Sequence, residues 1–503
     1  MTPSPERDSE VILSIDQGTT NTKAMLVSRS GNPVFCTATA VPLLQSHADR
    51  IEQSPRAIWE SLLSVSAKCL SYAAQASCRV GGIAISNQRE TAVAWHRASG
   101  EPLGNAVSWQ CRRSAEICRT LLQHSHAIQR RTGLPLDPLV TASKWRWMLV
   151  EDRDRPYREL ADADNLCLGT VDSWLIYKLT QGRVHATDHS NASRTALLNL
   201  RSLQWDDALL ALFDIPGSAL PQILPSSGNF GACTAIPELR GVPIVAAVGD
   251  SHAALAARGC ETAGAVKATY GTGSSLMMLS GALREEASSL AHTVAWSTAN
   301  ETLYALEGNI AMTGSAIQWV GEFLGLEHPV DDTTALAEGV DDAAGLFFVP
   351  AMAGLGAPHW DANARGLISG LCKSHRAAHL ARAAVEAIAY QVADVFHAME
   401  EATQSTLPAL YADGGATRNK SLMQFQADIL GRDVLRSNIE ELSCIGAAWL
   451  GGLTLGWWRT LAEPRDRVAH AERIRPAMPE GERTRLYAGW KTAVRRSLAQ
   501  VSA

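Results

Sequence analysis

The chain has 503 residues, of which 46% are hydrophobic and 19% are charged, and its formal net charge is −6 at pH 7. This balance is typical of a soluble globular protein with a large core, and the length suggests two or more domains. The net charge is acidic and no basic patch stands out that could bind a nucleic acid. No run of about 18 apolar residues is long enough to span a membrane. The first ten residues lack the basic start and apolar core of a signal peptide. We therefore expect a cytoplasmic protein with neither a nucleic-acid nor a membrane partner.

Two short apolar strands flank a polar turn at residues 11–27. The segments VILSID and AMLVS are strand-like, and the segment QGTTNTK between them is rich in glycine, threonine and asparagine. This order predicts a β-hairpin. A P-loop would instead lead from a strand into a helix and would contain GxxxxGK[ST], and neither condition holds here.

The turn of this hairpin has groups that suit phosphate and metal. Gly18 lets the backbone approach a phosphate without a Cβ, and the hydroxyls of Thr19 and Thr20 can donate hydrogen bonds. Asp16 ends the first strand, where a carboxylate can hold Mg²⁺ through water. Lys23 can neutralise a transferring phosphate as a point charge. The alternative is a plain polar turn, and a second turn of the same kind, described below, weakens that alternative.

A second polar run, NQRET at residues 87–91, follows the apolar strand GGIAIS. Five polar groups at the end of a buried strand are costly unless they contact a ligand or one another. Arg89 and Glu90 offer donors and acceptors suited to neighbouring hydroxyls, and the flat face of Trp109 suits a carbon chain. An internal Arg–Glu pair and a core tryptophan are the structural alternatives.

The segment VPIVAAVGDSHAAL at residues 242–255 predicts a buried strand that ends at Gly249 and Asp250. An alcohol attacks phosphorus poorly until a nearby group accepts its proton. Asp250 is our candidate for this general base, because a carboxylate at a strand end should face the site.

The second half of the chain contains a similar hairpin at residues 265–279. The segment AVKATYGTGSSLMML places two strands around the turn Gly271–Gly273, with Thr272 at its centre. The hairpins at 11–27 and 265–279 therefore look like equivalent elements of two similar halves. We expect an α/β protein with domains at 1–255 and 256–503 and a ligand cleft between them.

Two further segments are candidate nucleotide contacts. The turn at residues 413–415 follows a strand, and Gly415 there would let backbone pass close to a nucleotide while Asn419 could bond adenine or ribose. Gly314 and Gln318 lie four apart in a predicted helix and could present backbone and an amide on one face. An ordinary turn and ordinary helix packing are the alternatives.

A set of short motifs in order along residues 10–495 resembles glycerol kinase and the wider FGGY carbohydrate kinase family. They are DQGTT, NQRET, WQCRR, GTVDSWLIYKLTQG, TDHSNASRT, YGTG, ALEGNI, GLGAPHWD, DGGATRN and MQFQADILG. The resemblance implies two actin-like (ribonuclease H-like) domains that bind ATP, Mg²⁺ and a small polyol or sugar in the cleft between them. It implies an ATP-dependent kinase that phosphorylates a hydroxyl of that substrate, and dimers and tetramers occur among relatives.

The resemblance also implies roles at the matching positions. Lys23 stands where bacterial glycerol kinases often have arginine. The positive charge is kept, but the paired N–H donors with which arginine can bind two oxygens at once are lost. Phosphate and metal binding would fall to Asp16, Gly18, Thr19, Thr20 and Lys23, ATP binding to Thr272, Gly314, Gln318, Gly415 and Asn419, and substrate binding to Arg89, Glu90, Trp109 and Asp250.

Three positions depart from the glycerol kinase pattern, which has Tyr at Leu139, Gln at Ser251 and an aromatic residue at Ser275. The changes remove a hydroxyl donor and side-chain volume, so glycerol would lose contacts worth about 0.5–1.5 kcal/mol for each buried hydrogen bond. Our hypothesis is a substrate longer than glycerol, a polyol or ketose of four or five carbons, with glycerol as the alternative. His252 could contact an added hydroxyl or could pack beside the base.

Two further expectations concern regulation and class. The segment NFGACTAIPELRG is short and lacks the Gly- and Arg-rich pattern of the glycerol kinase loop that binds fructose 1,6-bisphosphate, so we expect no inhibition by this compound. The competing classes are an ATP-binding sensor of the actin fold that transfers no phosphate and an ATPase with a vestigial substrate site. An intact candidate base and substrate motif argue against both.

Overall fold

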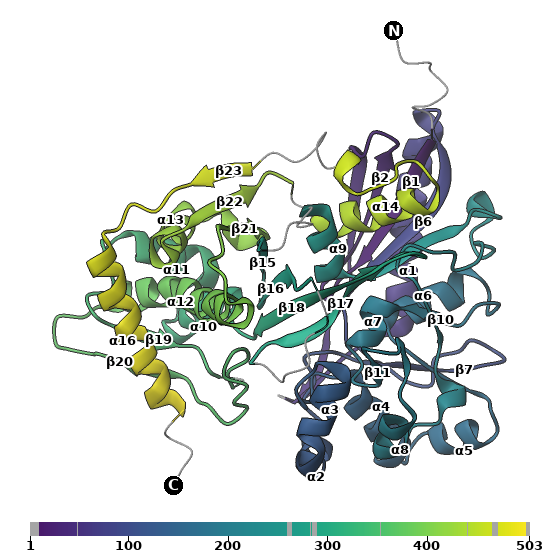
Figure 1. Cartoon of the computed structure of the whole chain (residues 1–503), viewed down its shortest axis with the longest axis horizontal. Helices are drawn as coiled ribbons and strands as arrows, with labels where there is room; N and C mark the ends of the chain where they lie inside the picture. The colour runs from purple at the N-terminus through teal and green to yellow at the C-terminus, as the bar shows by residue number, and fades with distance from the viewer. Residues whose placement is uncertain are drawn as a thin grey trace.

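The computed structural model describes residues 10–47, 49–258, 264–281, 283, 289–352, 354–439, 441–464 and 471–498. Two main β-sheets organise it, as Figure 1 shows. Within the described residues, no helix is long and apolar enough to cross a membrane.

The first sheet has five strands in the order β14-β6-β1-β2-β3. The three strands β14, β6 and β1 run parallel, while β1, β2 and β3 form an antiparallel meander. The predicted hairpin at 11–27 is confirmed as β1 and β2. The strands are β1 (Glu10–Gln17), β2 (Asn21–Ser28), β3 (Pro33–Ala40), β6 (Arg79–Asn87) and β14 (Ile244–Gly249).

The second sheet has seven strands in the order β17-β18-β16-β15-β21-β22-β23. The strands β15, β21 and β22 run parallel, and β15, β16 and β18 form an antiparallel meander, so five neighbouring strands repeat the pattern of the first sheet. This repetition confirms the two equivalent hairpins. The strands are β15 (Val266–Tyr270), β16 (Ser274–Leu279), β17 (Ala291–Ser297), β18 (Thr302–Ile310), β21 (Ala409–Asp413), β22 (Asp433–Ser437) and β23 (Ala471–Ile474).

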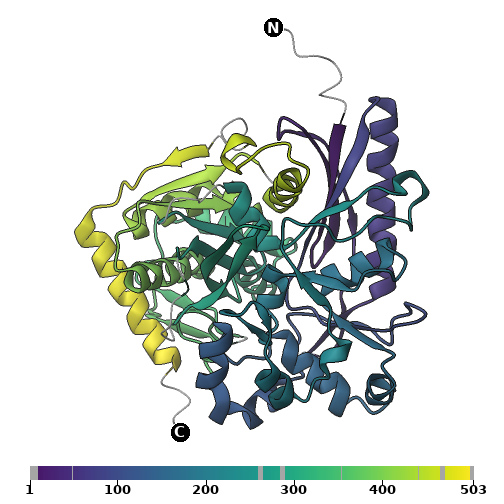
Figure 2. The ribbon, with the colours of Figure 1, turned by 45° about the vertical axis from the view of Figure 1, so that its right-hand side comes forward.

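Alternation along β1 explains why this strand is buried on both faces. Val11, Leu13 and Ile15 point into a core that includes α1 (Pro55–Gln75) and α6 (Val171–Leu179). Ile12 points to the opposite face, where the core contains α9 (Asp250–Arg258) and α14 (Leu442–Thr454). Successive side chains of a strand lie on opposite faces, so this apolar run is covered on both sides. Figure 2 shows α1 along the outer side of the first sheet.

The helices α9 and α14 join the two sheets through one core. That core takes Ile12 and Ala84 from the first sheet, Met277 and Ala305 from the second, and side chains of both helices. Although α14 lies far along the chain, it packs against β1, β2, β6 and β14; Figure 1 shows it beside these strands. The division of the chain near residue 255 stays a prediction, since this core spans it.

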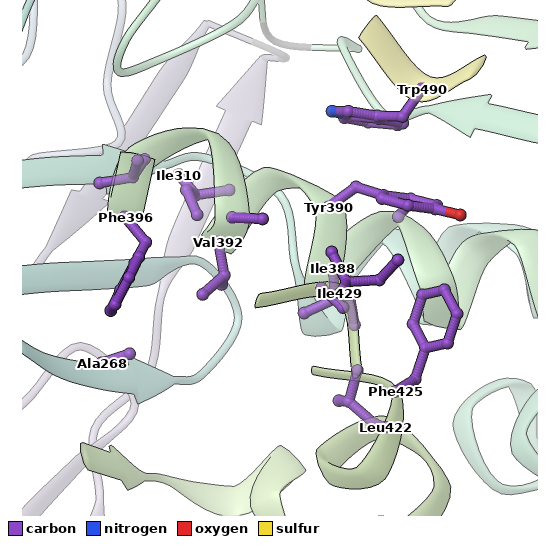
Figure 3. Close-up of a cluster of buried hydrophobic side chains, with 14 of the residues drawn as sticks. Ala268, Ile310, Ile388, Tyr390, Val392, Phe396, Leu422, Phe425, Ile429 and Trp490 are labelled. Carbon is purple, nitrogen blue, oxygen red and sulfur yellow. The ribbon is translucent and has the colours of Figure 1, made fainter. Parts of the chain in front are cut away.

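The opposite face of the second sheet is covered by α12 and its neighbours, and Figure 3 shows part of this core. The ring of Tyr390 on α12 stacks on Trp490, with centroids 5.2 Å apart, and meets the edge of Phe425 at 5.4 Å. Stacked and edge-to-face aromatic pairs add to the stability that burial alone provides. The helices of this half are α10 (Gly314–Phe323), α11 (Pro329–Glu338), α12 (Ala377–Thr403), α13 (Lys420–Leu430) and α16 (Glu480–Leu498).

The remainder of the first half forms short helices and small sheets around the carboxyl ends of β6 and β14. The helices are α2 (Ala115–Thr120), α3 (Ser125–Thr132), α4 (Thr141–Val150), α5 (Tyr157–Asp162), α7 (His189–Ser193) and α8 (Asp207–Phe213). The strands of the small sheets are β4 (Leu44–His47), β5 (Arg50–Gln53), β7 (Val93–His96), β8 (Ala106–Val107), β9 (Leu166–Gly169), β10 (Ala186–Asp188), β11 (Leu198–Asn199), β12 (Gln204–Trp205) and β13 (Gln222–Leu224), with β19 (Phe347–Val349) and β20 (Leu367–Ser369) in the second half.

Candidate active site

Three parallel strands of the first sheet end at the same edge and bring the candidate residues together. The register pairs Asp16 of β1 with Ser86 of β6, and Asn87 of β6 with Gly249 of β14. Asp250 follows Gly249 directly and begins α9, while Arg89 follows the end of β6. The carboxyl edge of a parallel sheet is a usual place for ligand sites in open α/β folds.

Asp16 is buried at this edge and has the electrostatics of a cation ligand. The hydroxyl of Ser86 donates to its Oδ1 at 2.8 Å. Burial, followed by the charge of Asp250, raises the pKa of Asp16 to about 7. A divalent cation would relieve both effects, because it stabilises the charged form of each carboxylate. Asp16 and its surroundings therefore fit Mg²⁺.

The turn after Asp16 is held by amide side chains and by Trp109. Gln88 donates through Nε2 to the side chain of Gln17 at 3.0 Å and to that of Gln53 at 2.7 Å. The indole Nε1 of Trp109 donates to Thr19 Oγ1 at 2.9 Å. Trp109 is only partly buried, so the core-tryptophan alternative is not what the structure shows. Its ring joins the candidate substrate residues to the candidate phosphate turn.

Other groups of this turn lie as follows. The amide of Gly18 closes the turn by donating to the carbonyl of Asn21 at 2.9 Å. Thr20 is exposed, and its hydroxyl accepts from Asn21 Nδ2 at 3.2 Å. Lys23 reaches across to the second half, where its Nζ pairs with Glu441 at 2.5 Å. The Lys23 charge is thus partly compensated in this arrangement.

Arg89 and Glu90 do not pair with each other but with charged groups from elsewhere in the chain. Arg89 Nε donates to Asp250 Oδ1 at 3.1 Å, and its Nη1 donates to Glu307 at 2.5 Å. Glu90 Oε1 accepts from Arg194 Nε at 2.6 Å. Neither Glu307 nor Arg194 is among the candidate site residues predicted from the sequence. Both lie within motifs that carry the family resemblance, ALEGNI and TDHSNASRT, which was the available signal.

The three positions that depart from the glycerol kinase pattern have different surroundings. The backbone amide of Ser251 donates to Asp250 Oδ1 at 2.6 Å, and the hydroxyl of Ser275 donates to Glu307 Oε1 at 2.8 Å. The side chain of Leu139 is partly buried, and its carbonyl accepts a hydrogen bond from Lys144. The hydroxyl hydrogen of Ser275 is therefore bonded to Glu307. The other effect of serine at this position is its small side-chain volume.

His252 packs in the interior, two residues after the candidate base. The ring is fully buried, and its Nε2 lies 3.3 Å from the hydroxyl of Thr293. Burial and the neighbouring charge of Arg89 hold the pKa of His252 well below its usual range. With the ring fully buried, its surroundings are those of the packing alternative.

The hairpin of β15 and β16 forms the corresponding edge of the second sheet. Thr272 at its turn is exposed, and its carbonyl accepts from the amides of Thr313 and Ser315 at 3.0 and 3.1 Å. Gly314 begins α10, and a Cβ there would lie 2.7 Å from the carbonyl oxygen of Gly271. The α10 helix can approach this turn so closely only because residue 314 is glycine.

The end of β21 leaves open space next to its backbone. Gly414 has φ of +95°, and a Cβ on Gly415 would meet no atom within 4 Å. Asn419 caps α13, since its Oδ1 accepts from the amide of Leu422 at 2.9 Å. Gln318 is exposed on α10 and donates to Glu322 at 2.8 Å. Exposed backbone beside open space suits a nucleotide.

The comparisons with known proteins agree with this geometry. Models of the N-terminal and C-terminal domains of the FGGY family of carbohydrate kinases match residues 11–257 and 266–455. This chain belongs to the FGGY family of carbohydrate kinases. It is 46% identical over 492 residues to an apulose kinase of Pectobacterium atrosepticum and 42% identical over 493 residues to a glycerol kinase of Burkholderia multivorans, covering 97% of this chain and 98% of each relative.

A solved structure supports the same family assignment. The structure of Plasmodium falciparum glycerol kinase with ADP superposes with a TM-score of 0.88 at 30% identity, covering 98% of this chain and 99% of that one. The protein is therefore an FGGY carbohydrate kinase with two actin-like halves, a phosphotransferase acting on a small sugar or polyol. The sensor and vestigial ATPase alternatives are set aside.

Proposed function

We propose that this FGGY kinase phosphorylates a polyol or ketose of four or five carbons, with Asp250 as the general base. The arrangement of Asp250 supports the role most directly. Its Oδ1 is held by Arg89 and by the amide of Ser251, and no hydrogen bond from the described residues reaches Oδ2. The side chain is 34% exposed, so Oδ2 can receive the proton of a bound hydroxyl.

The base works through orientation as much as through proton affinity. With Oδ1 fixed, the carboxylate does not need to reorganise when the hydroxyl oxygen attacks the γ-phosphorus of ATP. Removing a general base of this kind usually costs about 10²–10⁴-fold in rate. Asp250→Asn keeps the shape of the side chain and should lower kcat by this amount while KM for ATP stays close to the wild-type value.

The phosphates would lie between the two glycine-containing hairpin turns. Thr19 and Thr20 present hydroxyl groups beside Gly18 on the first sheet, and Thr272 and Gly415 lie at the matching edge of the second. Asp16 would hold Mg²⁺, which supplies charge neutralisation at the phosphates. Lys23 would add a point charge from the end of β2.

The preference for a longer substrate rests on two of the positions that depart from the glycerol kinase pattern and on one relative. Ser275 donates its hydroxyl hydrogen to Glu307, and Leu139 has no polar atom in its side chain, so neither side chain offers glycerol a hydrogen-bond donor. One relative is named an apulose kinase, and the -ulose ending denotes a ketose. The runner-up is glycerol itself, after which other relatives are named.

The discriminating experiment measures kcat/KM with ATP and Mg²⁺ for glycerol, erythritol, L-erythrulose, D-ribulose and D-xylulose. We expect a four- or five-carbon compound to exceed glycerol at least tenfold, about 1.4 kcal/mol of discrimination. Leu139→Tyr combined with Ser251→Gln should then improve glycerol turnover. A highest kcat/KM for glycerol in the wild type, or no gain in the double variant, would contradict the longer-substrate proposal.

A further inference from the structure

Glu307 lies on β18 of the second sheet, yet its carboxylate contacts two arginines of the first half. Its Oε1 accepts from Arg89 Nη1 at 2.5 Å, and its Oε2 lies 2.8 Å from Arg194 Nη1. Ser275 on the neighbouring strand donates to the same Oε1 at 2.8 Å. The Glu307 side chain has no exposed surface. A charge so deeply buried is stable only when its partners satisfy it.

The two arginines extend this contact to both candidate substrate carboxylates. Arg89 donates through Nε to Asp250 at 3.1 Å, and Arg194, which follows α7, donates through Nε to Glu90 at 2.6 Å. Glu307 thus pairs with both arginines. Through Arg89 it is linked to Asp250, the proposed base, and through Arg194 it is linked to Glu90, a candidate substrate residue. Burial would raise the pKa of Glu307, but the charges of Arg194 and Arg89 hold it well below its usual range.

These contacts fix which edge of the Arg89 guanidinium is available. The group is planar and has five N–H donors in a fixed arrangement. Nε is committed to Asp250 and Nη1 to Glu307, whereas Nη2 makes no hydrogen bond within the described part of the chain. Because the plane is held at two points, the direction of the free Nη2 donors is determined by Glu307 as well as by Asp250.

We propose that Glu307 is a positioning residue for the substrate: from the second half, it orients Arg89 of the first half so that the free edge of the guanidinium meets substrate hydroxyls. The proposal rests on the substrate-binding role that the proposed function gives to Arg89. It implies that the substrate site reaches its binding geometry only when β18 lies against the end of β6.

The test compares Glu307→Gln, Glu307→Asp and Arg89→Lys in steady-state assays with glycerol and with L-erythrulose, together with thermal unfolding. Glu307→Asp keeps the charge but withdraws the carboxylate by one methylene, so it separates geometry from charge balance. We expect both Glu307 variants to raise KM for the polyol or ketose at least tenfold, while KM for ATP changes less than twofold. Glu307→Asp keeps the proposal testable if Glu307→Gln fails to fold.

The matched control is Glu386→Gln. Glu386 is a buried carboxylate of the second half that pairs with Arg382 at 2.8 Å on α12. This variant should lower the unfolding midpoint without changing KM for either substrate. The positioning role would be overturned if Glu307→Asp has the wild-type KM for both glycerol and L-erythrulose. It would also be overturned if the Glu307 variants, like Glu386→Gln, lose only thermal stability.

The variant Arg89→Lys separates this proposal from the proposed function. It keeps one charge but loses the planar fork, so we expect it to raise KM for the polyol or ketose. If Arg89→Lys leaves that KM unchanged, the substrate-binding role of Arg89 fails and the positioning proposal falls with it. If Arg89→Lys raises KM and Glu307→Asp does not, only the positioning proposal is overturned.

Discussion

At the scale of single residues, Gly249 shows how the backbone admits the Arg89 side chain. A Cβ at Gly249 would lie 2.8 Å from both Cγ and Cδ of Arg89 and 2.9 Å from Nδ1 of His252. A flexible side chain could normally move away, but Arg89 is held at its far end by Asp250 and Glu307. The residue before Asp250 must therefore be glycine for Arg89 to lie where it does.

The variant Gly249→Ala should consequently displace Arg89 and impair use of the polyol or ketose. We expect kcat/KM for that substrate to fall at least tenfold, about 1.4 kcal/mol, with KM for ATP nearly unchanged. The control is Gly217→Ala, where a Cβ would make only an ordinary 3.4 Å contact with Leu210. Wild-type kinetics in Gly249→Ala would show that Arg89 has room to move.

Glu90 adds backbone strain at the same site. Its φ is +61°, in the left-handed region that residues with a Cβ seldom adopt. Its carboxylate is fixed by Arg194 at 2.6 Å. Strained conformations persist where surrounding contacts determine them, and they cluster at functional sites. The conformation of Glu90 is consistent with its proposed contact with substrate.

At the scale of elements, the crossing of α9 and α14 depends on a glycine. A Cβ on Gly446 of α14 would lie 1.8 Å from the carbonyl oxygen of Ala253 on α9. Backbone on both sides cannot move aside as a flexible side chain can. The two helices, which together fill the core between the sheets, approach closely only because Gly446 has no side chain.

We therefore expect Gly446→Ala to destabilise the protein by about 1–3 kcal/mol or more, the usual cost of overpacking a core. Thermal unfolding should show the loss as a lower midpoint. Gly481→Ala on α16 is the matched control, since a Cβ there meets no atom within 4 Å. An unfolding midpoint for Gly446→Ala equal to that of the control would mean that the helices separate without cost.

An aromatic cluster around β7, β9 and α6 gives a pH prediction. His185 lies 5.1 Å from the ring of Trp95, and its Nε2 bonds the carbonyl of Leu168 at 3.0 Å. Burial lowers the pKa of His185 to about 4. At a pH between about 4 and the ordinary pKa of 6.5, His185 binds a proton in the unfolded chain but not in the folded chain. The contribution of His185 to stability is therefore present above pH 6.5 and is lost as pH falls toward 4.

The measurement is the unfolding midpoint of the wild type and of His185→Gln between pH 7.5 and pH 5. Glutamine can still donate to Leu168 but does not titrate, so the wild type should lose at least about 2 °C relative to the variant as pH falls. The control His328→Gln changes an exposed histidine and should follow the wild type. Parallel profiles for wild type and His185→Gln would refute the argument.

At the scale of the whole molecule, direct polar contacts link the first half to elements that come much later in the chain. Besides the contacts of Glu307, Lys23 pairs with Glu441 at 2.5 Å, and Ser14 donates to the carbonyl of Cys444 at 2.6 Å. Each joins a strand of the first sheet to α14 or to the residue just before it. Any relative movement of the halves must therefore carry α14 with the first sheet or break these contacts.

Regulation is a second property at this scale. The segment 229–241 is short and is tied to the strand region by backbone bonds, with the amide of Cys233 donating to Val242 at 2.8 Å and that of Gly241 donating to Cys233 at 2.8 Å. It contains one arginine, Arg240, which offers little for two phosphates. We expect millimolar fructose 1,6-bisphosphate to leave kinase activity unchanged within twofold, and a clear loss of activity would contradict this.

Local patterns in the sequence were sufficient for the repeated hairpins, the strand that ends just before Asp250 and the family. A buried strand must be apolar and a turn beside a ligand needs small polar residues, so these features are written in consecutive residues. The partners of Arg89 and Glu90 were not predictable in this way. Glu307 follows Arg89 by 218 positions and Arg194 follows Glu90 by 104, and only the packing of the two sheets around α9 and α14 brings these charges together. Buried charges are stabilised by whatever the fold places beside them, so the tertiary structure alone decided which ion pairs form around Arg89 and Glu90.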